Sequence, residues 1–182
     1  MMRLRNTLEN RPDLRTERLT LRRPAQGDIP AIVAIVGQKS VAENLARVPH
    51  PYGAKDAQFF LEQVVPAEWV WAITLSGEDK LIGAVGLTPE ADADTAELGY
   101  WIDPAHWGTG IATEASREVL AYGFEILKLP RIVSGYFESN PASGKVLRKL
   151  GFLETGHVMR PCLAAGGEVP SVSMELLGTG GP

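Results

Sequence analysis

The 182-residue sequence has few of the features that mark secreted, membrane or nucleic-acid-binding proteins. It holds one cysteine, Cys162, so no disulfide can form within the chain, and a reducing compartment is the default expectation. The aliphatic run at residues 31–36 is too short to span a bilayer, and the first residues lack the apolar core of a signal peptide. A net charge of −4 gives no bulk attraction to nucleic acid or to an anionic membrane. We therefore expect a cytoplasmic protein that has neither as a partner.

Metal ligands and repeats are equally scarce. His50, His106 and His157 are far apart and show no metal-ligand spacing, so no metal is expected. The sequence contains no internal repeat and no low-complexity tract. The remaining composition is that of an ordinary globular protein, in a chain long enough to bury a sizeable core. We expect a single domain over residues 1–182, with residues 1–14 and 178–182 loosely held.

The apolar pattern predicts a mixed α/β domain. Strands are expected at residues 18–23, 69–75, 81–88, 97–102 and 131–137, with two closing strands near 152–159 and 171–176. Helices are expected at residues 29–36 after an Asp28 N-cap, at about 55–65, at about 109–127, and between an Asn140 N-cap and a Gly151 stop, with Pro141 first. The order is β-α-α-β-β-β-α-β-α-β-β. Because several strands follow one another directly, it favours a mostly antiparallel mixed sheet of about seven strands with helices on both faces.

Two glycines, Gly108 and Gly110, stand between the strand at 97–102 and the long helix that follows. A helix N-terminus attracts anions, and glycines leave room for a diphosphate to approach the backbone, with Ala112 keeping the next position small. The alternative is a plain tight turn. A dinucleotide fits less well because the third glycine position of the Rossmann fingerprint holds Thr113, and no Walker A lysine is present.

Together with "NPASGKVLRKLGF", these residues resemble the GNAT superfamily of acyl-CoA-dependent N-acyltransferases, and most of all its RimJ/RimL-type branch of ribosomal-protein N-terminal acetyltransferases. The matching stretches are "TERLTLRR", "ELGYWIDPAHWGTGIATEA" and Asn-x-x-Ser followed by "KLGF". The resemblance implies the GNAT fold with acetyl-CoA as the acyl donor. The glycine turn would bind the pyrophosphate, and the strand at 97–102 would pair with the pantetheine arm. Trp107 stands where the family often has Arg or Gln, so the backbone amides must hold the phosphates.

The residues that this resemblance assigns to the coenzyme come from one strand, the glycine turn and one helix. They are Tyr100, Trp101, Ile102, Trp107, Gly108, Thr109, Gly110, Ile111, Ala112, Thr113, Asn140, Ser143 and Lys145. Asn140 can serve as helix N-cap and contact the pantetheine amide at once. Lys145, Arg148 and Lys149 form a basic cluster, which is either a solvated helix face or a source of one contact to the coenzyme's 3′-phosphate.

Acyl transfer to an amine requires a neutral amine, a stabilised oxyanion and a proton for the leaving thiolate. Glu97 is the candidate base: it opens the strand beside the expected thioester and shares a face with Gly99, which leaves room for a substrate. The alternative is an ordinary solvated glutamate. Ser143, which the resemblance places near the sulfur, is the candidate acid, and its alternative is a helix-start role. Tyr136 is the second candidate acid.

The sequence favours an N-acetyltransferase that moves an acetyl group from acetyl-CoA to a primary amine by direct attack in a ternary complex. The amine belongs to a protein N-terminus or to a small molecule. The alternative is a GNAT-like module that binds acyl-CoA without turnover. Acceptor specificity is expected in the first two helices, in their loop at 46–57 and in the chain after Gly156, and a homodimer is compatible with this interpretation.

Overall fold

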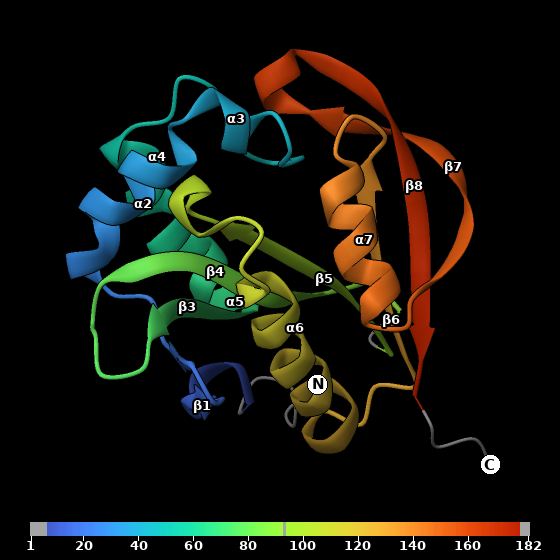
Figure 1. Cartoon of the computed structure of the whole chain (residues 1–182), viewed down its shortest axis with the longest axis horizontal. Coiled ribbons are helices and arrows are strands. Elements are labelled where there is room, and N and C mark those ends of the chain that lie inside the picture. Colours follow the sequence, from blue (N-terminus) through green and yellow to red (C-terminus); the bar gives the residue numbers. More distant parts are fainter. Residues whose placement is uncertain (1–6, 93, 179–182) are drawn as a thin grey trace.

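The computed structural model describes residues 7–92 and 94–178, in which one eight-stranded sheet has the order β1-β2-β3-β4-β5-β6-β8-β7 (Figure 1). The strands are β1 (Leu14–Arg15), β2 (Leu19–Arg22), β3 (Trp69–Leu75), β4 (Leu81–Pro89), β5 (Thr95–Ile102), β6 (Arg131–Phe137), β7 (Leu153–Cys162) and β8 (Gly167–Leu177). Every neighbouring pair is antiparallel except β5 and β6, which run parallel. The expected mixed, mostly antiparallel sheet is confirmed, with one more strand than the sequence predicted.

The helices fall between these strands in the predicted order. They are α2 (Ile29–Val36), α3 (Lys39–Ala42), α4 (Ala54–Phe59), α5 (Val65–Ala67), α6 (Ile111–Ala121) and α7 (Pro141–Lys149). Both α2 and α7 have their predicted bounds, the helices predicted at about 55–65 and 109–127 are divided, and α3 was not predicted. Shorter turns are η1 (Gln26–Asp28), η2 (Phe60–Val64), η3 (Pro104–His106), η4 (Tyr122–Ile126) and η5 (Leu163–Ala165), of which η2 and η4 are π-helical. The helix predicted at 109–127 therefore divides into α6 and a π-helical end. Gly123 in that end lies close to Leu87 and Ile132, where a Cβ would clash.

Helices cover both faces of the sheet, because alternate residues of each strand enter different cores. Trp69, Trp71 and Leu98 pack with residues of α6 and α7 on one face. Val70 and Ala72 pack with residues of α2 to α5 on the other. Figure 1 shows α6 and α7 standing in front of the strands. Both tryptophans of β3 are buried core residues, as their shared strand face predicts.

Two local predictions near the N-terminus need correction. Residues 1–6 lie outside the described ranges, as do 179–182, but Arg11 within the supposedly loose segment is buried and donates to the carbonyls of Val65, Glu68 and Val70. Burial lowers the pKa of this guanidinium to about 10. Asp28 does precede α2, but its side chain does not cap that helix. Its carboxylate accepts from the Ala25 amide and so closes η1 instead.

Candidate active site

The parallel strands β5 and β6 separate after only three residue pairs, the last being Glu97 with Val133. One residue later, the Ser134 hydroxyl donates to the Leu98 carbonyl at 2.9 Å, in place of a backbone ladder bond. Further along β5, the Ile102 carbonyl accepts from the Trp107 indole at 2.8 Å. Strand alternation then turns the Tyr100 backbone N–H and C=O toward the same opening, since Leu98 and Ile102 both face it. β5 therefore offers one unpaired strand edge at the centre of the sheet.

The glycine turn, residues 107–110, lies between the end of β5 and α6. Gly108 has a φ of +76° and Gly110 a φ of +84°, in the left-handed region that disfavours other residues. No atom lies within 4 Å of a Cβ built on Gly108, and one built on Gly110 meets only an Arg18 nitrogen at 3.5 Å. The Thr109 hydroxyl donates to the His106 carbonyl at 2.6 Å. The glycines are therefore required by backbone conformation, and they leave the N-terminus of α6 open to an anion.

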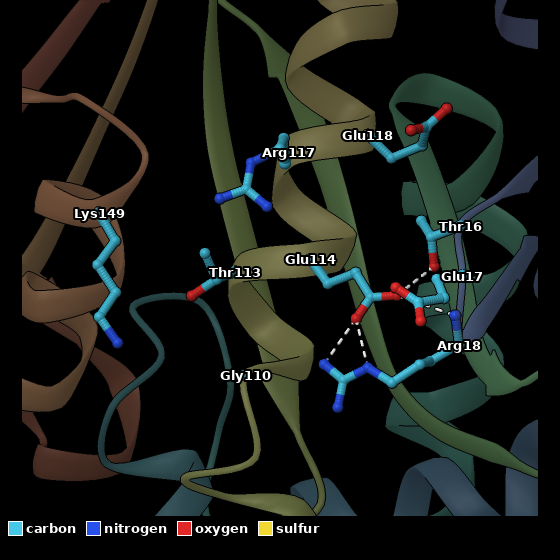
Figure 2. A pocket seen from close by; sticks show the side chains of 9 residues that line it. All are labelled: Thr16, Glu17, Arg18, Gly110, Thr113, Glu114, Arg117, Glu118 and Lys149. Carbon is cyan, nitrogen blue, oxygen red and sulfur yellow. Dashed lines mark hydrogen bonds and ion pairs between the residues drawn. The ribbon is translucent and has the colours of Figure 1, made fainter.

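A side-chain network from the turn between β1 and β2 braces the glycine turn, and no sequence pattern predicts it. The Arg18 guanidinium donates to the Thr109 carbonyl at 3.1 Å and forms an ion pair with Glu114 of α6 at 2.6 Å (Figure 2). Thr16 donates to the same carboxylate at 2.5 Å. Partial burial acts to raise the pKa of Glu114, but the hydrogen bonds from Thr16 and Arg18 and the Arg18 charge outweigh it and lower that pKa. Glu114 thus stays ionised, and the positive charge of Arg18 balances its negative charge beside the expected phosphate site.

A pocket of about 430 Å³ opens next to the glycine turn. Its walls include Gly110 and Thr113. The charged lining residues are the cations Arg18, Arg117 of α6 and Lys149 of α7 and the carboxylates Glu17, Glu114 and Glu118. Figure 2 shows Lys149 across the space from Thr113 and Arg117, while Arg18 turns toward Glu114. Lys145, the expected cation of α7, is not among the lining residues; Lys149, from the same basic cluster, is. Its i+4 position places it one helical turn further along the same helix.

Two candidate residues meet on the α6 and α7 side of β5. The hydroxyls of Tyr100 and Ser143 lie 2.8 Å apart. Burial, opposed by the hydrogen bond to Ser143, raises the pKa of Tyr100 to about 12. The Ser143 amide donates to the Asn140 side chain at 3.2 Å, so Asn140 is the N-cap of α7 as predicted. The Ser143 hydroxyl is therefore free of the capping role and belongs to a hydroxyl pair.

Tyr136, the second candidate acid, is committed to other contacts. Its hydroxyl accepts from Arg148 at 2.8 Å, and the Arg148 guanidinium lies 5.6 Å from its ring centroid. The ring packs under α7 at Gly144, where a Cβ would lie 2.6 Å from it. These contacts favour a structural role that seats α7 on β6.

Glu97, the candidate base, lies on the opposite face of β5 from Tyr100, as strand alternation requires. An ion pair at 2.6 Å joins its carboxylate to Arg160 of β7. Both side chains remain about one-third exposed, at 27% and 31%. Gly99, on the same face, is exposed, and a Cβ there would meet no atom within 4 Å. The space expected beside Glu97 exists, but the carboxylate already has Arg160 as a partner, a contact that no local sequence pattern predicts.

The described ranges, 7–92 and 94–178, contain neither a metal-ligand cluster nor a membrane-spanning helix. Within them, no group of three or more His, Cys, Asp or Glu side chains could hold a metal ion. No helix there is both long and apolar enough to cross a membrane.

The chain is similar to known N-acetyltransferases. Residues 18–153 match the model of the acetyltransferase (GNAT) domain. A Bacillus subtilis relative, "Uncharacterized N-acetyltransferase YoaA", is 34% identical over 152 residues, which cover 80% of this chain and 85% of the relative. The Escherichia coli ribosomal-protein-serine acetyltransferase is 35% identical over 80 residues, covering 43% of this chain and 45% of that protein.

Solved structures share the whole fold. A GNAT-family acetyltransferase from Bacillus anthracis superimposes with a TM-score of 0.81 at 23% identity, covering 91% of this chain and 98% of that one. A spermidine N-acetyltransferase from Vibrio cholerae, in complex with CoA and spermine, gives a TM-score of 0.76 at 25% identity. It covers 89% of this chain and 96% of the other.

Proposed function

The chain belongs to the GNAT family of N-acetyltransferases, in its RimJ/RimL-like branch, and from this membership we propose that it transfers acetyl directly from acetyl-CoA to a primary amine bound beside it. Family members use acetyl-CoA, and the Vibrio cholerae neighbour was solved with CoA. The proposal adds the direct attack, the residue roles and the acceptor. A cytoplasmic location remains part of it, supported by the single cysteine.

The residues present fit the coenzyme. Positive φ at Gly108 and Gly110 opens the N-terminus of α6, and no side chain of the turn fills the space above it. Backbone amides of the turn and of residues 111–113 would hold the pyrophosphate. The pantetheine arm would pair with the free backbone groups of Tyr100 along the β5 edge. Arg117 and Lys149 would provide charge for the remaining phosphate, in the role first assigned to Lys145.

The two faces of β5 would divide the proton transfers. An α-amine of pKa about 8 is roughly 10% neutral at pH 7, whereas less than about 0.1% of a lysine amine is neutral. Glu97, on the face where Gly99 leaves room, would accept the proton of the incoming amine, directly or through water. The Tyr100–Ser143 hydroxyl pair would donate a hydrogen bond to the departing thiolate from the other face.

One observation supports the proposal most directly: a strand edge without a partner ends in a turn whose glycines have left-handed backbone conformations, next to a helix N-terminus. A plain strand-to-helix turn explains the glycines but not the separation of β5 from β6. A module that binds acyl-CoA without turnover would share every one of these features. Only a measurement of catalysis therefore distinguishes such a module from an N-acetyltransferase.

The test is an acceptor screen with acetyl-CoA, followed by thiol release and by the mass of the product. The panel holds amino acids, spermidine, short peptides with free N-termini and peptides with a blocked N-terminus and an internal lysine. We expect stoichiometric release of thiol and acetylation of at least one primary amine. Binding of acetyl-CoA with no release across the panel would favour the binding module instead.

A further inference from the structure

Arg160 is placed where no capping or core role requires an arginine. It belongs to β7, the edge strand, and pairs there with Val169 of β8. Yet its guanidinium reaches past β8, to 3.0 Å from the Cβ position of Gly135 on β6, and ion-pairs with Glu97 on β5. A side chain at Gly135 would block this path. The Arg160 side chain thus carries a cation across β8 and β6, to the point where β5 and β6 separate.

The guanidinium keeps donors available at that point. The Glu97 carboxylate lies 2.6 Å from Nη2 of Arg160, and the guanidinium carries further N–H donors. The side chain is 31% exposed, and the neighbouring surface over Gly99 is open. Arginine presents its donors as a planar fork that matches a carboxylate. A ligand carboxylate can therefore reach Arg160 from the open side.

The loop expected to select the acceptor contributes a second pair of the same kind. Arg47 donates to both carboxylate oxygens of Glu68, at 2.7 and 3.2 Å, and Thr88 closes the network. The Glu97 charge acts on Arg47 as well, and the Arg47 side chain is 66% exposed. Glu68 and Glu97 are therefore each already paired with an arginine. A ligand that is only a cation would have to displace that arginine and would leave it without a counter-ion.

The two segments expected to select the acceptor, the loop at 46–57 and the chain after Gly156, are also in direct contact. The Leu163 amide, at the tip of the β7–β8 hairpin, donates to the Ala46 carbonyl at 3.2 Å. Cys162, buried at the end of β7, lies with its sulfur 3.6 Å from the Glu43 carbonyl. Figure 1 shows the hairpin tip beside the segment that follows α3. Arg47 and Arg160 are thus held on the same side of the molecule by connected backbone.

We infer that the acceptor is an amine that carries a carboxylate close by, with Arg160 binding the carboxylate while Glu97 takes the amine. This inference rests on the proposed acetyl transfer and deepens it. A dipolar ligand exchanges one ion pair for two: its ammonium replaces Arg160 at Glu97, and its carboxylate replaces Glu97 at Arg160. A polyamine would leave the partly buried Arg160 without an anion, which costs free energy. The same chemistry is presented by a free amino acid and by a peptide N-terminus with an acidic second residue.

The experiment measures kcat/KM for matched acceptors that differ in the carboxylate. Serine is compared with serinamide and ethanolamine, the dipeptide Ser-Glu with Ser-Lys, both as C-terminal amides, and spermidine serves as the polycation. The first set tests the amino acid source and the second the peptide source. We expect the carboxylate-bearing member of at least one set to exceed its partners by about tenfold or more, which corresponds to about 1.4 kcal/mol.

Arg160→Gln should abolish that ratio and increase kcat/KM for spermidine, since Glu97 is then freed for a cation. Arg160→Lys should restore part of the ratio. The matched control is Arg131→Gln on β6, an arginine whose partners are Asp92 and Glu175 and which lies outside the proposed site; it should keep the wild-type ratio. Equal or better use of spermidine and ethanolamine by the wild type would overturn the inference while leaving acetyl transfer intact. So would an unchanged ratio in a folded Arg160→Gln. An absence of thiol release with every acceptor would instead overturn the proposed function, and the inference with it.

Discussion

The proposed coenzyme side and the proposed acceptor side of β5 are built in different ways. On the coenzyme side, the residues are contiguous, at 107–113. The site there is formed mainly by backbone conformation, with Gly108 and Gly110 at positive φ. On the acceptor side, Arg47, Glu97 and Arg160 come from a loop, a central strand and an edge strand. The first arrangement suits a ligand that every family member shares, and the second suits one that differs between members. Side chains can be exchanged without rebuilding the backbone.

The largest effect should come from the hydroxyl pair on the coenzyme side. If Ser143 donates to the leaving thiolate, Ser143→Ala lowers kcat by about 10²-fold while the folded protein still binds acetyl-CoA. Because burial raises the pKa of Tyr100 to about 12, the pair stays protonated, and no loss of kcat from this source is expected between pH 7 and 10. Steady-state kcat against pH is the measurement. Full turnover in Ser143→Ala would move the proton donor to Tyr136 or to bound water.

Gly110→Val should weaken coenzyme binding by at least about tenfold, or about 1.4 kcal/mol, because a β-branched residue at φ +84° distorts the turn and fills the space of the pyrophosphate. Calorimetric titration with CoA gives the Kd. Gly77 in the β3–β4 turn is the matched control, with φ +85° and no atom within 4 Å of its Cβ position. Gly77→Val imposes similar strain far from the site and should leave the Kd unchanged. Equal Kd values for wild type and Gly110→Val would exclude the turn as the phosphate site.

Glu97→Gln tests the base on the acceptor side. We expect kcat/KM to fall by roughly tenfold at pH 7 and to recover as the pH rises toward 9, because more of the amine is then neutral without help. Loss of an acid would not be rescued in this way, so Ser143→Ala is the contrast. A Glu97→Gln profile that follows the wild type at every pH would leave Glu97 only the task of holding Arg160.

Arg18→Ala should have the smallest effect, since its ion pair with Glu114 is half exposed. We expect KM for acetyl-CoA to rise by about three- to fivefold, with a smaller change in kcat and partial rescue by Arg18→Lys. The lowered pKa of Glu114 means that the pair's contribution is present above the unfolded-state pKa and lost as the pH falls through the folded value. The KM ratio should therefore be constant from pH 6 to 9.

Arg22→Ala is the control for this prediction. Arg22 ends β2, four residues after Arg18, and is ion-paired with Asp28 and Asp79, away from the glycine turn. It should lower thermal stability without changing KM for acetyl-CoA. A rise in KM as large as that of Arg18→Ala would show that the bracing of the turn is not specific.

The features that the sequence predicts well are those encoded by neighbouring residues. Strand alternation assigns Glu97 and Tyr100 to opposite faces, and the Asn140–Pro141 start of α7 follows from capping preferences. The left-handed glycines before α6 follow from backbone sterics.

The features that it misses depend on side chains that meet over long separations. Arg18 reaches Glu114 across 96 residues, and Arg160 reaches Glu97 across the two strands β8 and β6. No periodicity or spacing reports such pairs, because nothing local distinguishes a bridging arginine from a solvated one. The sequence also does not show that Lys149, rather than Lys145, borders the pocket, because which turn of α7 lies there depends on how the helix packs against α6.

The most direct test of the central claim is a thermal melt of the wild type with CoA, with NAD and ATP as controls. CoA at about 100 times its Kd should stabilise the fold by roughly 2.7 kcal/mol if it binds only the folded state. We predict a rise in Tm with CoA that the other two nucleotides do not produce. The absence of a shift with CoA, or an equal shift with NAD, would contradict the assignment of the β5 edge and the glycine turn to the coenzyme of an N-acetyltransferase.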